Sequence, residues 1–235
     1  MKNLSIQLFL FLPLGLYSQD LALMEYNNIL RSWLVGEMVL NDGTRLTGMM
    51  QYNHYEGIIR VKQDDIIKSM LPRDFQSLTL LGNSKRQFLS IPFDIYKTGN
   101  NQPTLVEVLV EFDDFALMSV TSPLQAVRRP PNNNPAGNPD LQFEAQQTEF
   151  IYIFDDKGSM EKIMSIESYE SSSWFRASKV KKRVYDLKLL KQYIPDADYA
   201  GLEAYAKEHD LSFKERTELI MILEHYKSVL RKREE

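Results

Sequence analysis

The sequence contains no cysteine. This absence excludes disulfide bonds, thiol catalysis, cysteine-ligated metals and lipid attachment through a thiol. The sequence also lacks a nucleophile elbow of the G-x-S-x-G type, a Walker loop and an H-E-x-x-H zinc motif. We therefore expect no catalytic, cofactor-binding or metal-ligating residues, and no cofactor.

Histidine is scarce as well, with three residues at His54, His209 and His225. Zinc sites often place two histidines a few residues apart on one helix, and none of these is so spaced. His209 and His225 could meet only between neighbouring helices, with Glu224 nearby. We interpret the histidines as surface or packing residues.

Acidic residues allow two further hypotheses. A hydrolase needs two acids that meet across a cleft, for example Glu107 and Glu149. The aspartate pairs 64–65, 113–114 and 155–156 invite a calcium interpretation, but each follows an apolar run, where aspartate favours turns. We expect turns at all three pairs.

Long apolar runs are absent except near the start of the chain. Leu4–Leu16 is apolar with one amide, is interrupted by Pro13, and is followed by the small residue Ser18. This pattern is typical of a secretory signal peptide, and the run is shorter than the roughly 20 residues that a transmembrane helix needs. We expect residues 1–18 to be removed near Ser18 and the protein to be exported, to the periplasm or outside the cell. An exported chain without cysteine suits a bacterial envelope, because disulfides are common on eukaryotic secretory routes.

The net charge is −4, and it is unevenly distributed. Residues 19–175 carry 13 basic and 21 acidic side chains, whereas residues 176–235 carry 14 and 11. Such a change of sign often accompanies a change of structural unit. The overall acidity does not favour a nucleic-acid partner.

Residues 19–170 predict an antiparallel β-rich domain. Short runs of β-branched and aromatic residues alternate with turn signals, of which Asn41-Asp42-Gly43 is the clearest, because glycine accepts a positive φ without steric strain. We count about ten strands: residues 33–40, 44–52, 58–62, 66–71, 75–81, 86–93, 105–112, 115–121, 148–154 and 159–166. Residues 128–140 are rich in proline and asparagine, and we interpret them as a mobile loop, with a recognition loop as the alternative.

Residues 176–235 predict a small C-terminal helical region. We expect helices over residues 180–192, from Asp196 or Asp198 to Glu208, and from a capping box at Ser212 and Glu215 onward. The last helix presents one apolar face, formed by Leu219, Leu223, Tyr226 and Leu230. This face packs on the sheet, on the preceding helices or, alternatively, on a partner protein.

One basic segment is a candidate contact surface. It consists of five cations within eight residues: Arg176, Lys179, Lys181, Lys182 and Arg183. We interpret it as a solvated helix start or a complement to the acidic β-region. Contact with an anionic ligand or an envelope protein is the functional alternative.

Several short motifs can be compared with known families. They are the signal ending before Gln19; Trp33-x-x-Gly36 followed by Leu40-Asn41-Asp42-Gly43, Leu46-Thr47-Gly48 and Tyr52; and Lys188-Leu189-Leu190, Tyr193-Ile194, Leu211-Ser212 and Glu224-His225-Tyr226. In these motifs the chain resembles a group of exported bacterial envelope proteins of unknown function. The resemblance implies location and fold and no active site.

The sequence thus predicts an α+β protein: an antiparallel β-domain followed by a small helical region. The favoured hypothesis is a non-enzymatic interaction or structural module of the envelope. An envelope hydrolase that uses paired carboxylates is the first alternative. A small-ligand binder with a barrel-like sheet is the second.

Overall fold

The computed structural model describes residues 32–53, 56–82, 84–94, 99, 101–122, 125–128, 143–170 and 179–234. Twelve strands form one sheet, and the described strands pair antiparallel with their neighbours. The strands are β1 (Leu34–Leu40), β2 (Arg45–Asn53), β3 (Ile58–Gln63), β4 (Ile66–Met70), β5 (Phe75–Leu81), β6 (Lys85–Pro92), β7 (Pro103–Glu111), β8 (Phe115–Thr121), β9 (Gln125–Arg128), β10 (Phe143–Asp155), β11 (Met160–Glu170) and β12 (Lys179–Val184).

The sheet order is β12-β11-β10-β8-β7-β6-β5-β1-β2-β3-β4, with β9 paired to β10. Most neighbours in the sheet are consecutive in the sequence. At the β1–β2 turn, Gly43 has a φ of 84°, and the Asp42 carboxylate accepts a hydrogen bond of 2.8 Å from the backbone N–H of Thr44. That bond holds the pKa of Asp42 below its ordinary value. The predicted hairpin signal is confirmed.

Two strands were not predicted, and one predicted helix is wrong. Residues 179–184 form β12, not the start of a helix over 180–192. The six residues of β12 pair in register with Met164–Tyr169 of β11. Hydrogen bonds between these strands stabilise the extended conformation more than the weak helical preference of the segment stabilises a helix. Helical structure begins only at Leu187, where the Asp186 carboxylate accepts a hydrogen bond from the backbone N–H of Lys188.

The second strand that was not predicted is β9, which lies at the start of the predicted loop. Arg128 is the last residue of this strand. Residues 129–140 of the proline- and asparagine-rich segment lie outside the described residues.

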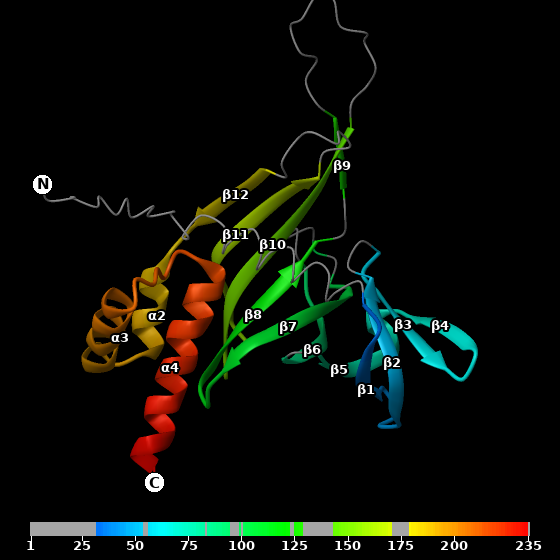
Figure 1. Cartoon of the computed structure of the whole chain (residues 1–235), viewed down its shortest axis with the longest axis horizontal. Coiled ribbons are helices and arrows are strands. Elements are labelled where there is room, and N and C mark those ends of the chain that lie inside the picture. The colour runs from blue at the N-terminus through cyan, green and yellow to red at the C-terminus, as the bar shows by residue number, and fades with distance from the viewer. Residues whose placement is uncertain are drawn as a thin grey trace, which may run out of the picture.

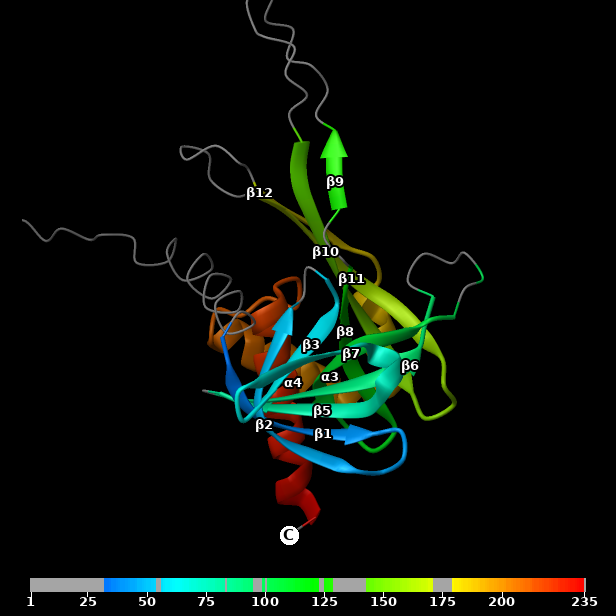
Figure 2. The same ribbon diagram turned by 90° about the vertical axis from the view of Figure 1, so that its right-hand side faces the viewer.

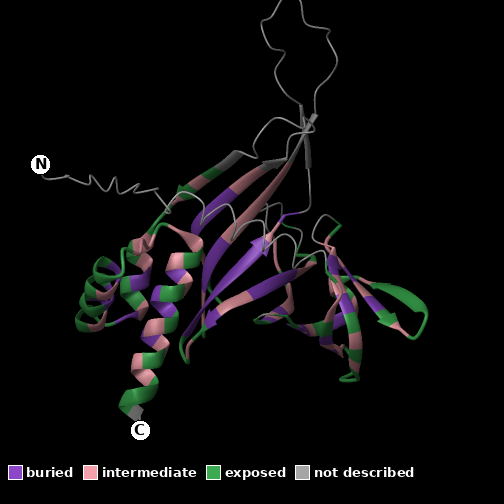
Figure 3. Ribbon diagram, viewed as in Figure 1, coloured by how far each residue is buried: buried purple, intermediate pink, exposed green. Residues whose placement is uncertain are grey.

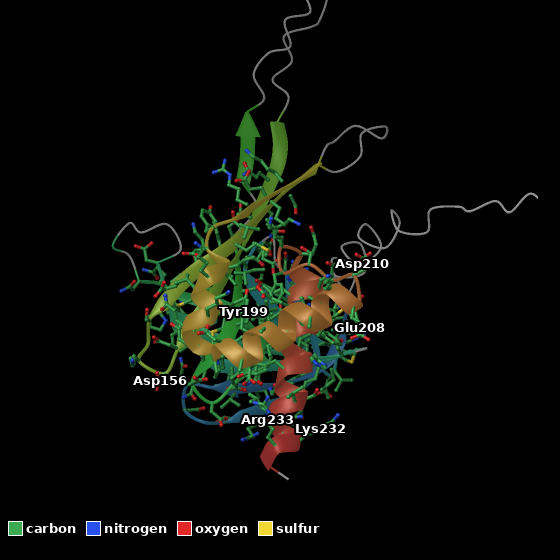
Figure 4. All side chains as sticks on the ribbon, turned by 90° about the vertical axis from the view of Figure 1, so that its left-hand side faces the viewer. Asp156, Tyr199, Glu208, Asp210, Lys232 and Arg233 are labelled. Atoms are coloured by element: carbon green, nitrogen blue, oxygen red, sulfur yellow. The ribbon has the colours of Figure 1, made fainter. Side chains whose placement is uncertain are left out.

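Three C-terminal helices follow the sheet: α2 (Leu190–Tyr193), α3 (Asp196–Glu208) and α4 (Arg216–Glu234). They lie together beside β7, β8, β10 and β11 (Figure 1). In α3, Asp196 and Asp198 occupy the first turn, where carboxylates interact favourably with the helix dipole. Asp198 also receives two hydrogen bonds, of 2.9 and 2.7 Å, from the Arg233 guanidinium near the end of α4 (Figure 4).

The interior contains two inner clusters. The helix-side core joins the sheet to the helices: Val110, Phe115, Leu117, Ile151, Ile153, Ile163, Met164, Ile166, Leu190, Ile194, Tyr199, Leu202, Ala206, Leu219, Ile222, Leu223 and Tyr226. The N-terminal core is built from strands: Met38, Met50, Tyr52, Ile59, Val61, Phe75, Leu78, Leu80, Phe88 and Leu105. The predicted apolar face of the last helix therefore packs on the sheet.

A third cluster lies on the opposite face of the central strands, which is why both faces of β8 are buried (Figure 3). Its buried members are Val106, Ala116, Met118, Val120 and Tyr152. The Tyr152 ring contacts Phe93 edge-to-face at a centroid distance of 5.2 Å. Burial raises the pKa of Tyr152 to about 12, with a smaller contribution from Tyr185.

This tyrosine gives a prediction for alkaline pH. The phenol titrates near 10 in an unfolded chain, so between about pH 10 and 12 the folded state binds more protons than the unfolded state. The free energy of unfolding should therefore fall through this range, while the contribution of Tyr152 is fully present below about pH 10. In urea titrations at several pH values, the Tyr152→Phe variant should lose less stability than the parent. Equal losses would contradict the prediction.

Candidate functional site

The two inner clusters share one face of the sheet and meet at a polar junction. A continuous cross-strand row runs Met38, Leu78, Phe88, Glu107, Ser119, Ile151, Met164 from β1 to β11. The first three residues belong to the N-terminal core and the last two to the helix-side core. Glu107 and Ser119, both buried, therefore lie between two apolar regions.

The structure brings together the two acids named for the hydrolase hypothesis. Glu107 comes from β7 and Glu149 from β10, and both contact Arg216 at the first position of α4. The Arg216 Nε donates a hydrogen bond of 2.7 Å to Glu149, and its Nη2 lies 3.6 Å from a Glu107 oxygen. One guanidinium thus bridges the two carboxylates.

A second arginine completes the group. Arg86 on β6 donates two hydrogen bonds to the Glu107 carboxylate, from Nε at 2.6 Å and from Nη2 at 2.7 Å. Both side chains are 9% exposed. Tyr52 lies close by, and its burial, followed by the charge of Glu107, raises the pKa of the phenol. We call Arg86, Glu107, Glu149 and Arg216 the ionic junction.

The chemistry of the ionic junction favours a structural role. Two guanidinium groups balance two carboxylates, and bidentate pairs of this kind are the strong class of charged hydrogen bonds. Both carboxylates accept hydrogen bonds from arginine, Glu107 from Arg86 and Glu149 from Arg216. The geometry therefore fits ion pairs that join strands of the sheet to the start of α4.

The start of α4 departs from the predicted capping box. The Ser212 backbone N–H donates to the Glu218 carboxylate at 2.7 Å, and the Ser212 hydroxyl accepts from the backbone N–H of Lys214 at 3.2 Å. Glu215, the predicted partner, instead forms an ion pair with Lys182 of β12. Ion pairs therefore join the sheet to the start of α4 at two places. One is the Lys182–Glu215 pair at β12, and the other is the ionic junction.

The described part of the predicted basic segment lies on β12, where its side chains divide between the two sides of the strand. Arg176 lies outside the described residues, and Lys179 is the first residue of β12. Side chains alternate along a strand, so Lys182 faces the helices, while Lys181 and Arg183 are exposed on the other side. Because β12 ends the sheet, its lysines fit the common use of charge to protect an edge from pairing.

Both C-terminal histidines pack against the same residue, Tyr205 of α3. Ring centroids of Tyr205 and His225 lie 3.7 Å apart, and those of Tyr205 and His209 lie 4.2 Å apart. Among the described residues, no group of three or more potential ligands could hold a metal ion. The packing interpretation fits this geometry, while His54 lies outside the described residues.

Two aspartate pairs show turn geometry. Asp64 has a φ of 53° between β3 and β4. The Asp155 carboxylate accepts hydrogen bonds from the backbone N–H groups of Lys157 and Ser159, at 3.1 and 2.7 Å. The predicted turns at these two pairs are confirmed, and the Asp155 carboxylate organises the second of them.

The other end of the sheet is β4, an edge strand with exposed apolar side chains. Among the described strands, β4 pairs only with β3, and the β3–β4 hairpin projects away from the body of the protein (Figure 1). Its two isoleucines are among the most exposed large apolar side chains, with Ile66 at 62% and Ile67 at 56%. Sequence reasoning found this strand but not its position at an edge, because sheet order is set by distant pairings.

No helix in the described parts of the chain is both long enough and apolar enough to span a bilayer. Comparison with protein-family models, with curated proteins and with solved structures found no match.

Proposed function

We propose that this chain is an exported, non-enzymatic interaction module of the bacterial cell envelope, which binds an extended segment of a partner protein along β4. The exposed apolar edge at Ile66 and Ile67 carries the proposal. Export is inferred from the signal-like pattern of residues 1–18.

The physical argument compares the two ends of the sheet. An edge strand offers unpaired backbone groups, and natural proteins usually blunt such edges with charge. The described part of β12 follows this practice with exposed Lys181 and Arg183, whereas β4 has one exposed lysine, Lys68, next to two exposed isoleucines. Adding a strand to β4 would bury these side chains and provide main-chain hydrogen bonds, which is the usual mode of β-strand addition.

The side-chain order of β4 indicates what kind of segment fits. Alternation places Ile66, Lys68 and Met70 on one side of the strand, and Ile67 and Ser69 on the other. A matching segment would place apolar residues opposite the isoleucines and a carboxylate near Lys68.

Ile67→Lys tests the proposal. In a capture experiment with tagged protein and envelope extract from the host, this variant should bind the partner at least about tenfold more weakly than the parent, a difference of about 1.4 kcal/mol. Lysine would lose the apolar contact and place a second cation beside Lys68. Quantitative mass spectrometry of the captured protein provides the measurement.

Met221→Lys is the matched control, because Met221 is 49% exposed on α4 and lies away from the edge. It should leave capture unchanged. A third variant, Lys181→Glu with Arg183→Glu, tests the basic segment. If capture survives Ile67→Lys and is lost in the third variant, the partner binds at β12 and the β4 proposal is wrong.

A further inference from the structure

The outer face of the N-terminal strands carries an apolar row that no described residue covers. Met49, Val35 and Leu81 are direct cross-strand neighbours on β2, β1 and β5, and they are 38%, 54% and 50% exposed. Lys62 flanks the row on β3, and Lys85 flanks it on β6. We call Met49, Val35 and Leu81 the outer row; its strands lie in front of the helices in Figure 2.

A shallow hollow adjoins the row. It has a volume of about 600 Å³ and is lined by Thr47, Gly48, Met49, Lys62, Gln63 and Asp64. The outer face thus offers apolar side chains and a recess that could accept a large side chain.

We infer that residues 19–31 of this same chain bind across the outer row. The described chain begins at Ser32, only three residues before Val35, which is the middle member of the row. The preceding thirteen residues are rich in apolar side chains: Leu21, Ala22, Leu23, Met24, Tyr26, Ile29 and Leu30. They also carry Asp20 and Glu25, which complement the two flanking lysines, and one basic residue, Arg31, directly before Ser32.

Length and tethering both favour this occupant. Five neighbouring strands span about 19 Å, whereas thirteen residues can reach about 40 Å when extended. A short tether gives the segment an effective concentration in the millimolar range. Even a weak intrinsic affinity would therefore keep the row covered, and a second copy or another protein would have to bind more tightly to displace the segment.

The test uses the absence of cysteine from the chain. A single Val35→Cys substitution in the protein that retains residues 19–31 reports access to the row through its rate of thiol labelling. Adding Ile29→Asp and Leu30→Asp should speed labelling by at least about tenfold, because two apolar side chains that would be buried on the row are replaced by charged ones. Met49→Cys provides a second probe if Val35→Cys does not fold.

Asn27→Asp with Asn28→Asp is the matched control, since it adds the same charge at polar positions and should leave the rate unchanged. Equal rates with and without the apolar substitutions would overturn the inference. Protection that grows with protein concentration would also overturn it, because a second copy would then be the occupant. Neither result depends on the β4 edge. The labelling test can therefore contradict this inference without contradicting the proposed function, and the capture experiment can do the reverse.

Discussion

Replacing Glu107 by glutamine is expected to lower the free energy of unfolding by about 3 kcal/mol or more. The Glu107 carboxylate holds the Arg86 guanidinium through two hydrogen bonds, and both side chains are 9% exposed. Glutamine keeps the shape but removes the charge, so Arg86 would remain buried next to an uncharged amide. Urea unfolding followed by circular dichroism measures the change, provided that the slope of the transition is unaltered.

A double variant separates this charge effect from loss of packing. Arg86→Met with Glu107→Met removes both charges, while Arg216 keeps its 2.7 Å hydrogen bond to Glu149. Replacing a buried ion pair by apolar residues of similar size is often neutral, so the double variant should be more stable than Glu107→Gln. A double variant as unstable as the single one would contradict this assignment.

Glu37→Gln is the solvent-exposed control. Glu37 pairs with Arg45 across β1 and β2, and the two side chains are 42% and 70% exposed. Exposed pairs contribute about 1 kcal/mol or less, because water and salt screen them. If Glu107→Gln were no more harmful than Glu37→Gln, the ionic junction would be screened like a surface pair and would not hold the two cores together.

The fold was predictable where the signal was local. Asp42-Gly43 forces a hairpin through its own backbone geometry, and the predicted α+β order of strands and helices is confirmed. The helix starting near Asp196 and the apolar face of α4 were predictable for the same reason. Helix-capping residues and the spacing of apolar residues along a helix depend on only a few neighbouring positions.

Predictions failed where the outcome depends on distant partners. The segment Lys179–Val184 is a strand because β11 is available to pair with it, and a run of cations does not reveal that partner. The acids Glu107 and Glu149 were proposed as a pair, and the structure shows both in contact with Arg216. Their chemistry was not predictable, because Arg86 and Arg216 reach them from other elements and convert a pair of acids into a balanced ionic group.

The largest expected effect on the attachment of the helices comes from Leu223→Ala. Leu223 is fully buried on α4 and belongs to the helix-side core with Leu117 and Ile151 of the sheet. Truncating a fully buried leucine lowers the free energy of unfolding by about 2–5 kcal/mol, because apolar contacts are lost and a cavity remains. Urea unfolding should show this loss as a shift of the midpoint.

Met221→Ala on the same helix is the matched control, because Met221 is 49% exposed and should cost about 0.5 kcal/mol or less. Both variants should unfold in a single transition, since seventeen buried residues of strands and helices form one cluster. A separate early transition of the helical signal would show that the helices are only loosely docked. Equal effects of the two substitutions would place Leu223 outside the core, and the C-terminal helices could then no longer be regarded as the cover of the sheet.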